Sequence, residues 1–397
     1  MKSPAARILM LLENNPYESD IRVIREAQTL TGAGYVVSVI SPRPPGGRFH
    51  VFTDGVHVYH FPGAQPGART LGYLWEYSYA MAATFVVCLY VYLRRGFDVI
   101  HAHNPPDTFF IIASFFKMLG KQFVYDHHDL APEMYLARFE GVGKGIAYRV
   151  LMALEKLSYL LADLIIVTNG SYKEVAMDRG GAPANRIAVV RNGPDLREIP
   201  SALAGPSSRP MPEMTIGYIG RIGPQDGVDF LLRALQHLVY GLARSDVLCI
   251  VIGDGDMVPA LKLLASDLRI QDNVRFTGWV PHEEAMRILA TVDICVDPDP
   301  SNAYNDRSTM IKIMEYMALG KPIVAFDLPE HRETAREAAI YASPNDELDF
   351  ARKLAHLLGD EKRCQEMGSI GKERIERSLA WSHQEKKLLE AYVALRS

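Results

Sequence analysis

The sequence predicts an α/β fold with two doubly wound domains, each built on a mostly parallel sheet with helices on both faces. Three observations carry this prediction. The chain has 397 residues, enough for two domains of ordinary size. Short β-branched runs alternate with helical periodicity from end to end, as is typical of parallel sheets. A stretch dense in Pro, Ser and Gly, 197–214, interrupts the alternation and predicts a linker.

The first domain is expected over residues 1–200. Short apolar runs predict its strands, at Ile8–Leu12, Val36–Ile40, Val56–Phe61, Val99–His101, Phe123–Asp126, Leu164–Thr168 and Ile187–Val190. Apolar spacing of three and four predicts its helices, near Asp20–Thr31, Leu71–Arg95, Pro106–Leu119, Lys144–Leu161 and Ser171–Asp178.

The second domain is expected over residues 201–378, followed by a C-terminal helix over 379–397 that packs back toward the first domain. The same criteria predict strands at Thr215–Ile219, Val247–Ile252, Val274–Thr277, Ile294–Val296 and Ile323–Phe326. They predict helices near Val228–Leu242, Met257–Leu268, Glu283–Thr291, Thr309–Leu319, Pro329–Ala338, Leu348–Leu358, Glu361–Ser378 and Ser382–Arg396.

Composition excludes several classes of protein. An apolar fraction of 48% with 23% charged residues excludes disorder and a disulfide-stapled miniprotein. A net charge of −4 argues against nucleic-acid binding. The four cysteines show no metal-type spacing, and no signal peptide is recognised at the N-terminus, so reduced thiols and a cytoplasmic location are expected.

The run Tyr79–Leu93 is apolar apart from one threonine and is followed by Arg94 and Arg95. It is shorter than the roughly 20 residues that cross a bilayer. Two interpretations stay open. It forms a buried core helix, or it lies in the headgroup region on the inner face of the membrane.

Two doubly wound domains predict a deep cleft, with ligands bound beyond the carboxyl ends of the strands. The turn from Gly220 to Gly223 follows a strand, and its glycines let backbone N–H groups approach an anion that Arg221 can grip. The turn Gly253-Asp254-Gly255 follows the next strand. It lacks a full dinucleotide or P-loop motif, which argues against a dehydrogenase.

The segment 306–324 is the most specific of the chain. Ser308 or Thr309 is expected to cap a helix whose first turn offers N–H groups to an anion. Lys312 is expected to bring its charge to the same anion. Glu315 stands three residues further, about 4.5 Å along the helix axis, where its carboxylate can accept two hydrogen bonds from a vicinal diol such as a ribose.

In the first half, His101-Ala102-His103 and Asp126-His127-His128-Asp129 end neighbouring strands, which brings their histidines to one rim. A metal site, structural histidines and direct contact with a polar substrate remain open, with the last favoured. The loop 13–20 is expected to line the cleft, although Asp20 or Ser19 can simply cap the next helix. Asp297-Pro298-Asp299 is interpreted as a turn rather than a metal-binding acid pair.

At these residues the chain resembles the retaining nucleotide-sugar glycosyltransferases of family 4, which have the GT-B fold. The likeness runs nearly the whole length and is strongest over 217–327, in YIGRIGPQDGVDFLLRAL, VIGDGD, NVRFTGWVP and KIMEYMALGKPIVAFD. FDVIHAHNPPD, FVYDHHDLAPE and IAVVRNGPD resemble first-half counterparts. The variants GPQDG and RSTMIKIMEY, with the entry Asp20-x-Arg22, look closest to members that build bacterial surface polysaccharides and lipid-linked saccharides.

The resemblance implies residue roles. Arg221 would contact the donor diphosphate and Glu315 its ribose, while 278–281 would lie by the base and His128 near the reacting carbon. With Arg221, Lys312 and His128 as the catalytic set, an acceptor side is predicted at Asn15, Asp20, His103 and His127. The predicted donor-binding residues are Gly220, Gly223, Gly253, Gly255, Val280, Arg307, Ser308, Thr309, Met310, Ile311 and Glu315.

Two departures from the family pattern stand out. Asp226 stands where the family usually has a lysine, and Arg307 where it has a glutamate, so Lys312 and Arg307 are expected to restore the positive charge. The prediction is a metal-independent hexosyl- or N-acetylhexosaminyltransferase that uses a nucleoside diphosphate sugar, with UDP expected, and a saccharide or polyprenyl-linked acceptor. The alternatives are a nucleotide-sugar 2-epimerase of the same fold and a non-catalytic binding subunit.

Overall fold

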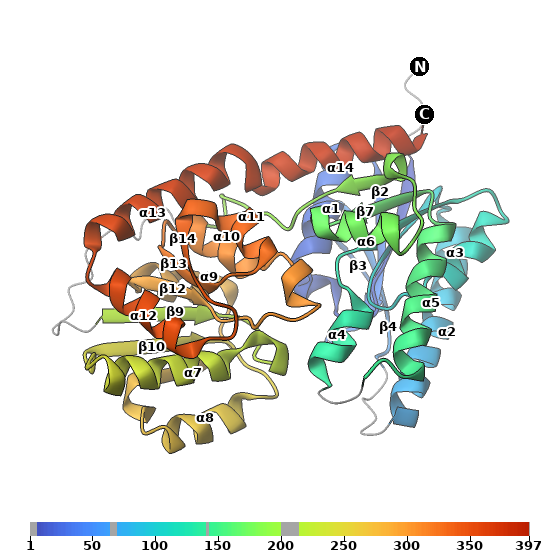
Figure 1. The fold of residues 1–397 in the computed structure, drawn as a ribbon. Helices are drawn as coiled ribbons and strands as arrows, with labels where there is room; N and C mark the ends of the chain where they lie inside the picture. Colours follow the sequence, from blue (N-terminus) through green and yellow to red (C-terminus); the bar gives the residue numbers. More distant parts are fainter. Residues whose placement is uncertain (1–5, 64–69, 140–142, 200–213, 397) are drawn as a thin grey trace. The chain divides into compact units, whose positions relative to one another are not determined.

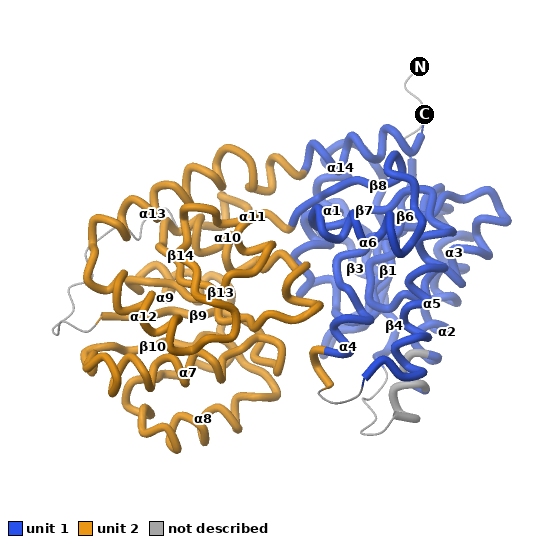
Figure 2. The backbone as a smooth tube through the Cα atoms, in the orientation of Figure 1, with its two compact units in different colours: residues 1–136, 141–191, 385–397 blue, residues 137–140, 192–384 orange. Residues whose placement is uncertain are grey.

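The computed structural model describes residues 6–63, 70–139, 143–199 and 214–396. The chain divides into two compact units (Figure 2). The first comprises residues 1–136, 141–191 and 385–397, and the second comprises 137–140 and 192–384. Most of the expected linker, 200–213, lies outside the described residues.

The first unit is built on an eight-stranded sheet in the order β3-β4-β2-β1-β5-β6-β7-β8 (Figure 1). All neighbours are parallel except β3 and β4, which are antiparallel. Edge strand β3 was not predicted, because it has only four residues, too few to show a period. The strands are β1 (Arg7–Leu11), β2 (Val36–Pro42), β3 (His50–Thr53), β4 (Val56–Phe61), β5 (Val99–His103), β6 (Gln122–His127), β7 (Leu164–Val167) and β8 (Ile187–Val189).

Strand order reverses at β1, which pairs with β2 on one side and β5 on the other. A doubly wound sheet binds ligands at such a reversal, at the carboxyl edge. Helix α4 was not predicted, and α3 begins four residues later than expected, after the Asn104-Pro105-Pro106 turn. The helices are α1 (Ile21–Gly32), α2 (Thr70–Arg94), α3 (Phe110–Lys117), α4 (Ala131–Arg138), α5 (Ile146–Leu161) and α6 (Gly170–Asp178).

Helix α2 is partly buried, so the core-helix interpretation holds for one of its faces, and contact with a membrane stays a prediction. Cys88 and Val91 are fully buried, whereas Val86 is 64% and Leu93 is 82% exposed. One face therefore packs on the first unit, and the other presents apolar side chains to the surface. Among the residues that the structure describes, no helix has both the length and the hydropathy needed to cross a bilayer.

The second unit is built on a fully parallel six-stranded sheet in the order β11-β10-β9-β12-β13-β14. Its strands feed two buried clusters in alternation: Cys249 and Val251 join one cluster, Ile250 and Ile252 the other. Strand β14 was not predicted, being four residues between two helices. The strands are β9 (Met214–Ile219), β10 (Val247–Ile252), β11 (Val274–Gly278), β12 (Ile294–Asp297), β13 (Ile323–Phe326) and β14 (Ala339–Ala342).

Two predicted helices of this unit end earlier than expected in wider π turns, at His237–Gly241 and Ile375–Leu379. The final helix spans α14 (Trp381–Arg396), and its last turns belong to the first unit. There the Tyr392 hydroxyl lies 2.9 Å from His101 Nδ1. The remaining helices are α7 (Val228–Gln236), α8 (Val258–Asp267), α9 (His282–Thr291), α10 (Ile311–Ala318), α11 (Pro329–Ala335), α12 (Glu347–Leu358) and α13 (Glu361–Arg374).

Candidate active site

The rim of the first unit gathers charged side chains from three elements, α1, β5 and β6. Parallel pairing sets His103 beside Asp126, so both reach the carboxyl edge of the sheet. Arg22 comes in from α1 and donates to both oxygens of Asp126, at 2.8 Å to Oδ2 and 3.0 Å to Oδ1. The Asp20-x-Arg22 motif therefore has two functions. Asp20 caps α1 by accepting a hydrogen bond from the Val23 N–H, and Arg22 reaches into the rim.

Asp126 organises this rim electrostatically. Burial by itself would raise the pKa of its carboxyl, but the charge of Arg22 and the hydrogen bond from His128 hold that pKa well below its ordinary value. The group is thus a permanent anion. It accepts a bond from His128 Nδ1 at 3.2 Å.

His128 is the one predicted first-unit histidine that keeps access to the surface, with 14% of its side chain exposed. Burial lowers its pKa, but the hydrogen bond to Asp126 and the negative charge of that group outweigh burial, and the net pKa is raised. The side-chain oxygen of Asn104 accepts the backbone N–H groups of His128 and Asp129, at 2.8 and 3.1 Å. Asn104, which sequence reasoning missed, therefore fixes the loop that carries His128.

The two other predicted histidines are buried, which corrects the expected acceptor side. His127 points to the opposite face of β6, where its Nδ1 lies 2.7 Å from the Tyr159 hydroxyl and its Nε2 lies 3.1 Å from Glu155. His103 is 3% exposed and turns toward Asp126 and Glu26. Neither side chain offers surface to an acceptor. Asn15 is exposed in the loop after β1 and stays a prediction.

In the second unit, the N–H groups of the predicted glycines donate hydrogen bonds within the chain. Gly220 N–H donates to Ile252 O, Gly253 N–H to Gly278 O, and Gly223 N–H to the Asp226 carboxylate. The Gly255 N–H donates to Asp254 Oδ1. Contact of these amides with a phosphate stays a prediction.

Two of these positions require glycine because the loops approach each other closely. A Cβ on Gly253, whose φ is +128°, would stand 1.9 Å from the Gly220 carbonyl oxygen. A Cβ on Gly255 would stand 2.2 Å from that of Ile222. Side chains would push the loops after β9 and β10 apart.

Lys312 is not available as a second cation for a diphosphate, contrary to prediction. Its ammonium is buried, 2.6 Å from Asp299 and 3.3 Å from Asp297, and lies over the Tyr218 ring at 4.9 Å. Burial lowers the pKa of Lys312, but the two carboxylates outweigh it and hold the pKa well above its ordinary value. The expected turn 297–299 is thus a buried acid pair that neutralises this lysine.

The predicted cap of the 311–318 helix is also wrong. Ser308 Oγ donates to Tyr304 O, and Thr309 Oγ1 donates to Glu330. Helix α10 begins instead after Met310, and no side chain in the described part of the chain caps it. Its first N–H groups, from Ile311 onward, therefore keep the capacity to bind an anion.

Arg221 and Glu315 keep the accessibility that their predicted roles require. Arg221 is exposed and makes no ion pair or hydrogen bond to any described residue. The side chain of Glu315 is 13% exposed and lies 3.8 Å from His282 Nε2. Arg307 is also exposed, and its guanidinium donates a hydrogen bond to the Ala303 carbonyl. Val280 is partly buried, while its neighbour Trp279 is 75% exposed.

A tyrosine missed by sequence reasoning holds the elements of this site together. The Tyr316 hydroxyl of α10 accepts the Ile219 N–H at 3.0 Å and donates to Val296 O at 3.2 Å. This fixes α10 to the carboxyl ends of β9 and β12, two residues from Arg221. Asn305 adds a bond from its side chain to Gln225 O at 2.9 Å.

Among the described residues, two groups of side chains have the donor types and closeness that a metal ion requires. Asp297, Asp299 and His331 form one group, although Lys312 already provides a positive charge there. The second group lies at the rim of the first unit and is made of Glu26, His101, His103 and Asp126.

Two Rossmann-like units on one chain define a GT-B transferase architecture. Residues 21–193 match the family model described as "Glycosyl transferase 4-like domain", and residues 213–360 match "Glycosyl transferases group 1". The chain belongs to this family of glycosyltransferases.

Curated relatives match over part of their length. A Corynebacterium glutamicum protein, described as a GDP-mannose-dependent monoacylated alpha-(1-6)-phosphatidylinositol monomannoside mannosyltransferase, is 27% identical over 41% of this chain and 42% of its own. A D-inositol 3-phosphate glycosyltransferase of Thermomonospora curvata is 30% identical over 44% of this chain and 41% of its own. The match thus spans about two fifths of these relatives.

Solved structures confirm the fold over nearly the whole chain. A sucrose-phosphate synthase from Thermosynechococcus elongatus has a TM-score of 0.82 at 17% identity, covering 98% of this chain and 99% of that one. HepE from Anabaena, in complex with UDP and glucose, has a TM-score of 0.73 at 17% identity, covering 98% and 100%.

Proposed function

We propose that the protein is a retaining, metal-independent glycosyltransferase that moves a hexosyl or N-acetylhexosaminyl group from a UDP-sugar to a saccharide or lipid-linked acceptor in the biosynthesis of cell-surface polysaccharides. One observation carries the donor side of this proposal. Tyr316 fastens the uncapped start of α10 to the strand that leads into Arg221. A cation and free backbone N–H groups are thereby tied to one edge of the second sheet.

This arrangement answers the main electrostatic demand of sugar transfer, which is the charge that develops on the leaving diphosphate. Arg221 supplies a guanidinium fork, and the α10 N-terminus supplies N–H groups and the positive end of its dipole. Because Lys312 is already neutralised, Arg221 is the cation on which the proposal chiefly depends. The departing phosphate would then take the acceptor proton, so a second catalytic carboxylate is not required.

On the acceptor side, His128 is the proposed contact with the reacting sugar. Its raised pKa favours an imidazolium held by Asp126, which donates hydrogen bonds rather than accepting them. Asn15 remains the proposed polar contact of the loop after β1.

A first prediction concerns donor binding through Glu315. A donor at about 100 times its Kd stabilises a protein by about 2.7 kcal/mol. We expect one UDP-sugar to raise Tm of the wild type, and Glu315→Ala to abolish that rise, because the ribose diol loses its acceptor. A thermal-shift screen over UDP-, GDP- and ADP-sugars measures this change in Tm. The matched control is Glu366→Ala, which replaces an exposed glutamate of α13.

Four outcomes would contradict parts of the proposal. If no nucleotide sugar stabilises the protein, the proposed donor site is wrong. If GDP-mannose alone stabilises it, the donor nucleotide is GDP and not UDP. Conversion of donor without any acceptor would indicate the 2-epimerase. Tight binding without transfer to any acceptor would indicate an accessory subunit.

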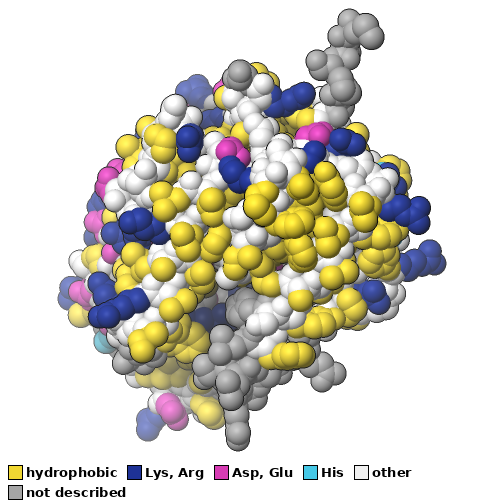
Figure 3. Space-filling model, turned by 90° about the vertical axis from the view of Figure 1, so that its right-hand side faces the viewer, with side chains coloured by type: hydrophobic (Ala, Val, Ile, Leu, Met, Phe, Trp, Pro, Cys, Tyr) yellow, Lys and Arg dark blue, Asp and Glu magenta, His cyan; other side chains and the backbone are white. Residues whose placement is uncertain are grey.

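A lipid-linked acceptor is supported by the outer face of the first unit. Exposed apolar side chains project from α2, α3 and α5, and Figure 3 shows them gathered on one face. Basic side chains also lie on these helices, while the one acidic residue of α3 and α5, Glu155, is buried. The apolar members are Val86, Leu93, Ile111, Met118, Ile146 and Leu160, and the exposed basic members are Arg94, Lys144, Arg149 and Lys156; Met118 directly follows α3, and Lys144 lies two residues before α5.

An apolar hollow of about 310 Å³ opens beside α2, lined by Phe49, Tyr79 and Val86 among others. Its size suits a segment of hydrocarbon chain. Apolar surface with positive charge is the combination that binds anionic bilayers. We therefore propose peripheral contact with the inner face of the cell membrane through α2, α3 and α5.

A second prediction follows for vesicle binding. We expect sedimentation with phosphatidylglycerol-containing vesicles, and at least about 10-fold weaker binding for Leu93→Asp combined with Met118→Asp, since both carboxylates would enter the headgroup region. Leu263→Asp, at a side chain 69% exposed on α8 of the second unit, is the control. Equal loss in the control, or no binding by the wild type, would contradict the membrane face.

A further inference from the structure

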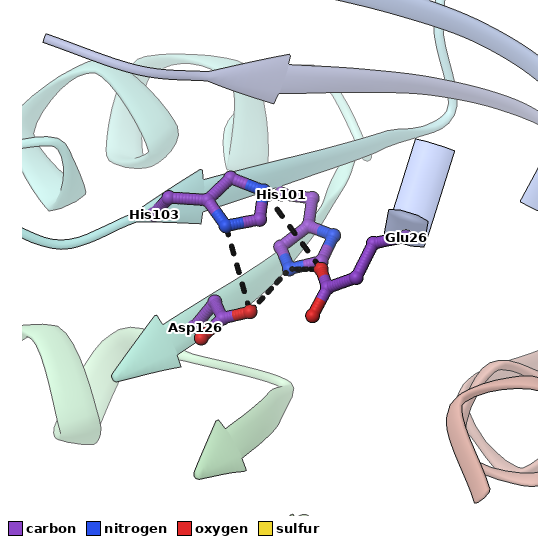
Figure 4. Close-up of side chains that lie close together, drawn as sticks. All are labelled: Glu26, His101, His103 and Asp126. Carbon is purple, nitrogen blue, oxygen red and sulfur yellow. Dashed lines mark ion pairs between the residues drawn. The ribbon is translucent and has the colours of Figure 1, made fainter. Parts of the chain in front are cut away.

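We propose that Glu26, His101, His103 and Asp126 bind one divalent transition metal ion of the zinc type. Figure 4 shows the four side chains converging from α1, β5 and β6. The site lies in the first unit, and the proposal does not depend on the identity of the donor sugar. The ion takes no part in sugar transfer, whose charge neutralisation stays with Arg221 and α10.

Unsatisfied buried polar atoms are the first argument. Glu26 and His101 have no exposed surface, and His103 is 3% exposed. Glu26 Oε2, His101 Nε2 and both ring nitrogens of His103 have no hydrogen-bond partner among the described residues, while Glu26 Oε1 is paired with Arg22. A buried polar atom without a partner is costly. Four such atoms in one cluster indicate a bound species that pairs with them.

The spacing of the donor atoms is the second argument. His101 Nε2 stands 3.6 Å from Glu26 Oε2 and 3.6 Å from Asp126 Oδ2. His103 Nδ1 stands 3.5 Å from Asp126 Oδ2, and His103 Nε2 stands 4.0 Å from Glu26 Oε2. Ligands about 2.1 Å from a tetrahedral ion are separated by about 3.4 Å. The atoms are thus too far apart for good hydrogen bonds. An ion would take only one nitrogen of His103, and one ligand atom from each of the four residues lies within 4.8 Å of the other three.

Donor chemistry selects the class of ion. Two imidazoles and two carboxylates suit zinc or a neighbouring first-row metal, whereas calcium and magnesium prefer oxygen ligands alone.

Surrounding groups complete the arrangement. The Tyr392 hydroxyl, 2.9 Å from His101 Nδ1, can accept the proton of that nitrogen and direct Nε2 to the ion. Arg22 contacts Glu26 Oε1 at 3.0 Å and holds Asp126, which orients both carboxylates and offsets part of their charge. Burial raises the pKa of Glu26 well above its ordinary value, so a proton there is the competitor that the ion would displace.

The consequence is mechanical. An ion at this point would join α1 to β5 and β6, and through Tyr392 would fasten the last turns of α14. It would also fix Asp126 and, through it, the ring of His128. Metal loading would therefore stabilise the first unit.

The test uses the full chain, stripped with a chelator and titrated with Zn²⁺ against a chromophoric competitor. We expect one equivalent bound, a higher Tm on loading, and at least about 100-fold weaker affinity for Glu26→Gln and for His103→Gln. His356→Gln, an exposed histidine of α12, should bind as the wild type does.

Two results would overturn the proposal. The first is a wild type that binds no stoichiometric Zn²⁺, Co²⁺ or Mn²⁺, which would leave the proton on Glu26 as the compensating species. The second is binding abolished by His331→Gln and kept by Glu26→Gln and His103→Gln, which would move the ion to Asp297 and Asp299. The wild-type titration decides the first result even if a variant fails to fold, and circular dichroism identifies such a variant.

Discussion

Replacing Arg221 by alanine is expected to lower kcat for sugar transfer about 10²–10³-fold. That is the typical cost of removing one preorganised donor from a developing oxyanion. Arg221 is exposed and unpaired among the described residues, whereas Lys312 is fully engaged with two aspartates. The helix N-terminus would then face the leaving diphosphate without a guanidinium. Initial rates with a saturating UDP-sugar measure the effect.

Arg233→Ala provides the matched control for that experiment. Arg233 belongs to the same unit and makes an ordinary surface pair with Asp229 on α7. Its loss should leave kcat within about twofold, because exposed pairs contribute little. If kcat of Arg221→Ala is unchanged, the arginine has no role in catalysis. The N-terminus of α10 would then be the only proposed group that stabilises the diphosphate.

Lys312→Met is expected to destabilise the folded protein by about 3–5 kcal/mol, because it leaves buried carboxylates without their cation. Asp297 and Asp299 have at most 1% exposure, so water does not replace the lost charge. The double variant Lys312→Met with Asp299→Asn should recover part of the loss. Chemical denaturation followed by circular dichroism measures both.

Lys353→Met is the control here, since its pair with Asp349 is an exposed i, i+4 contact at 3.9 Å. Its cost should stay below about 0.5 kcal/mol. If Lys312→Met keeps wild-type stability and instead loses donor affinity, the lysine faces the diphosphate as the sequence alone suggested, and the buried pairing is not what holds it.

Asp226, which stands where the family usually has a lysine, has a structural role. Its carboxylate accepts the Gly223 N–H at 2.9 Å and so shapes the turn that follows Arg221. Together with Asp297 and Asp299 it adds to the negative charge around Lys312. The departure from the family pattern thus belongs to an internal network, in which the acidic residue and the lysine offset each other.

Strand and helix periodicity made most elements predictable, since Val56–Phe61, Val247–Ile252 and Ile323–Phe326 coincide with the observed strands. The misses were elements too short to show a period, namely β3, β14 and α4. Local signals such as Gly253-Asp254-Gly255 indicated a turn correctly. They did not show that the Gly253 N–H was already bonded, because its partner, the Gly278 carbonyl, ends another strand 25 residues along the chain.

The sequence by itself determined the fold class and the family, because periodicity and motif order are properties of local sequence. The roles of Arg221 and His128 stay predictions. Only the tertiary structure decided which polar groups are already satisfied. Lys312, His103 and His127 carry the residue types of a binding site, and packing places each against a buried partner. Whether a charge faces a substrate or its own chain depends on long-range contacts that no spacing in the sequence records.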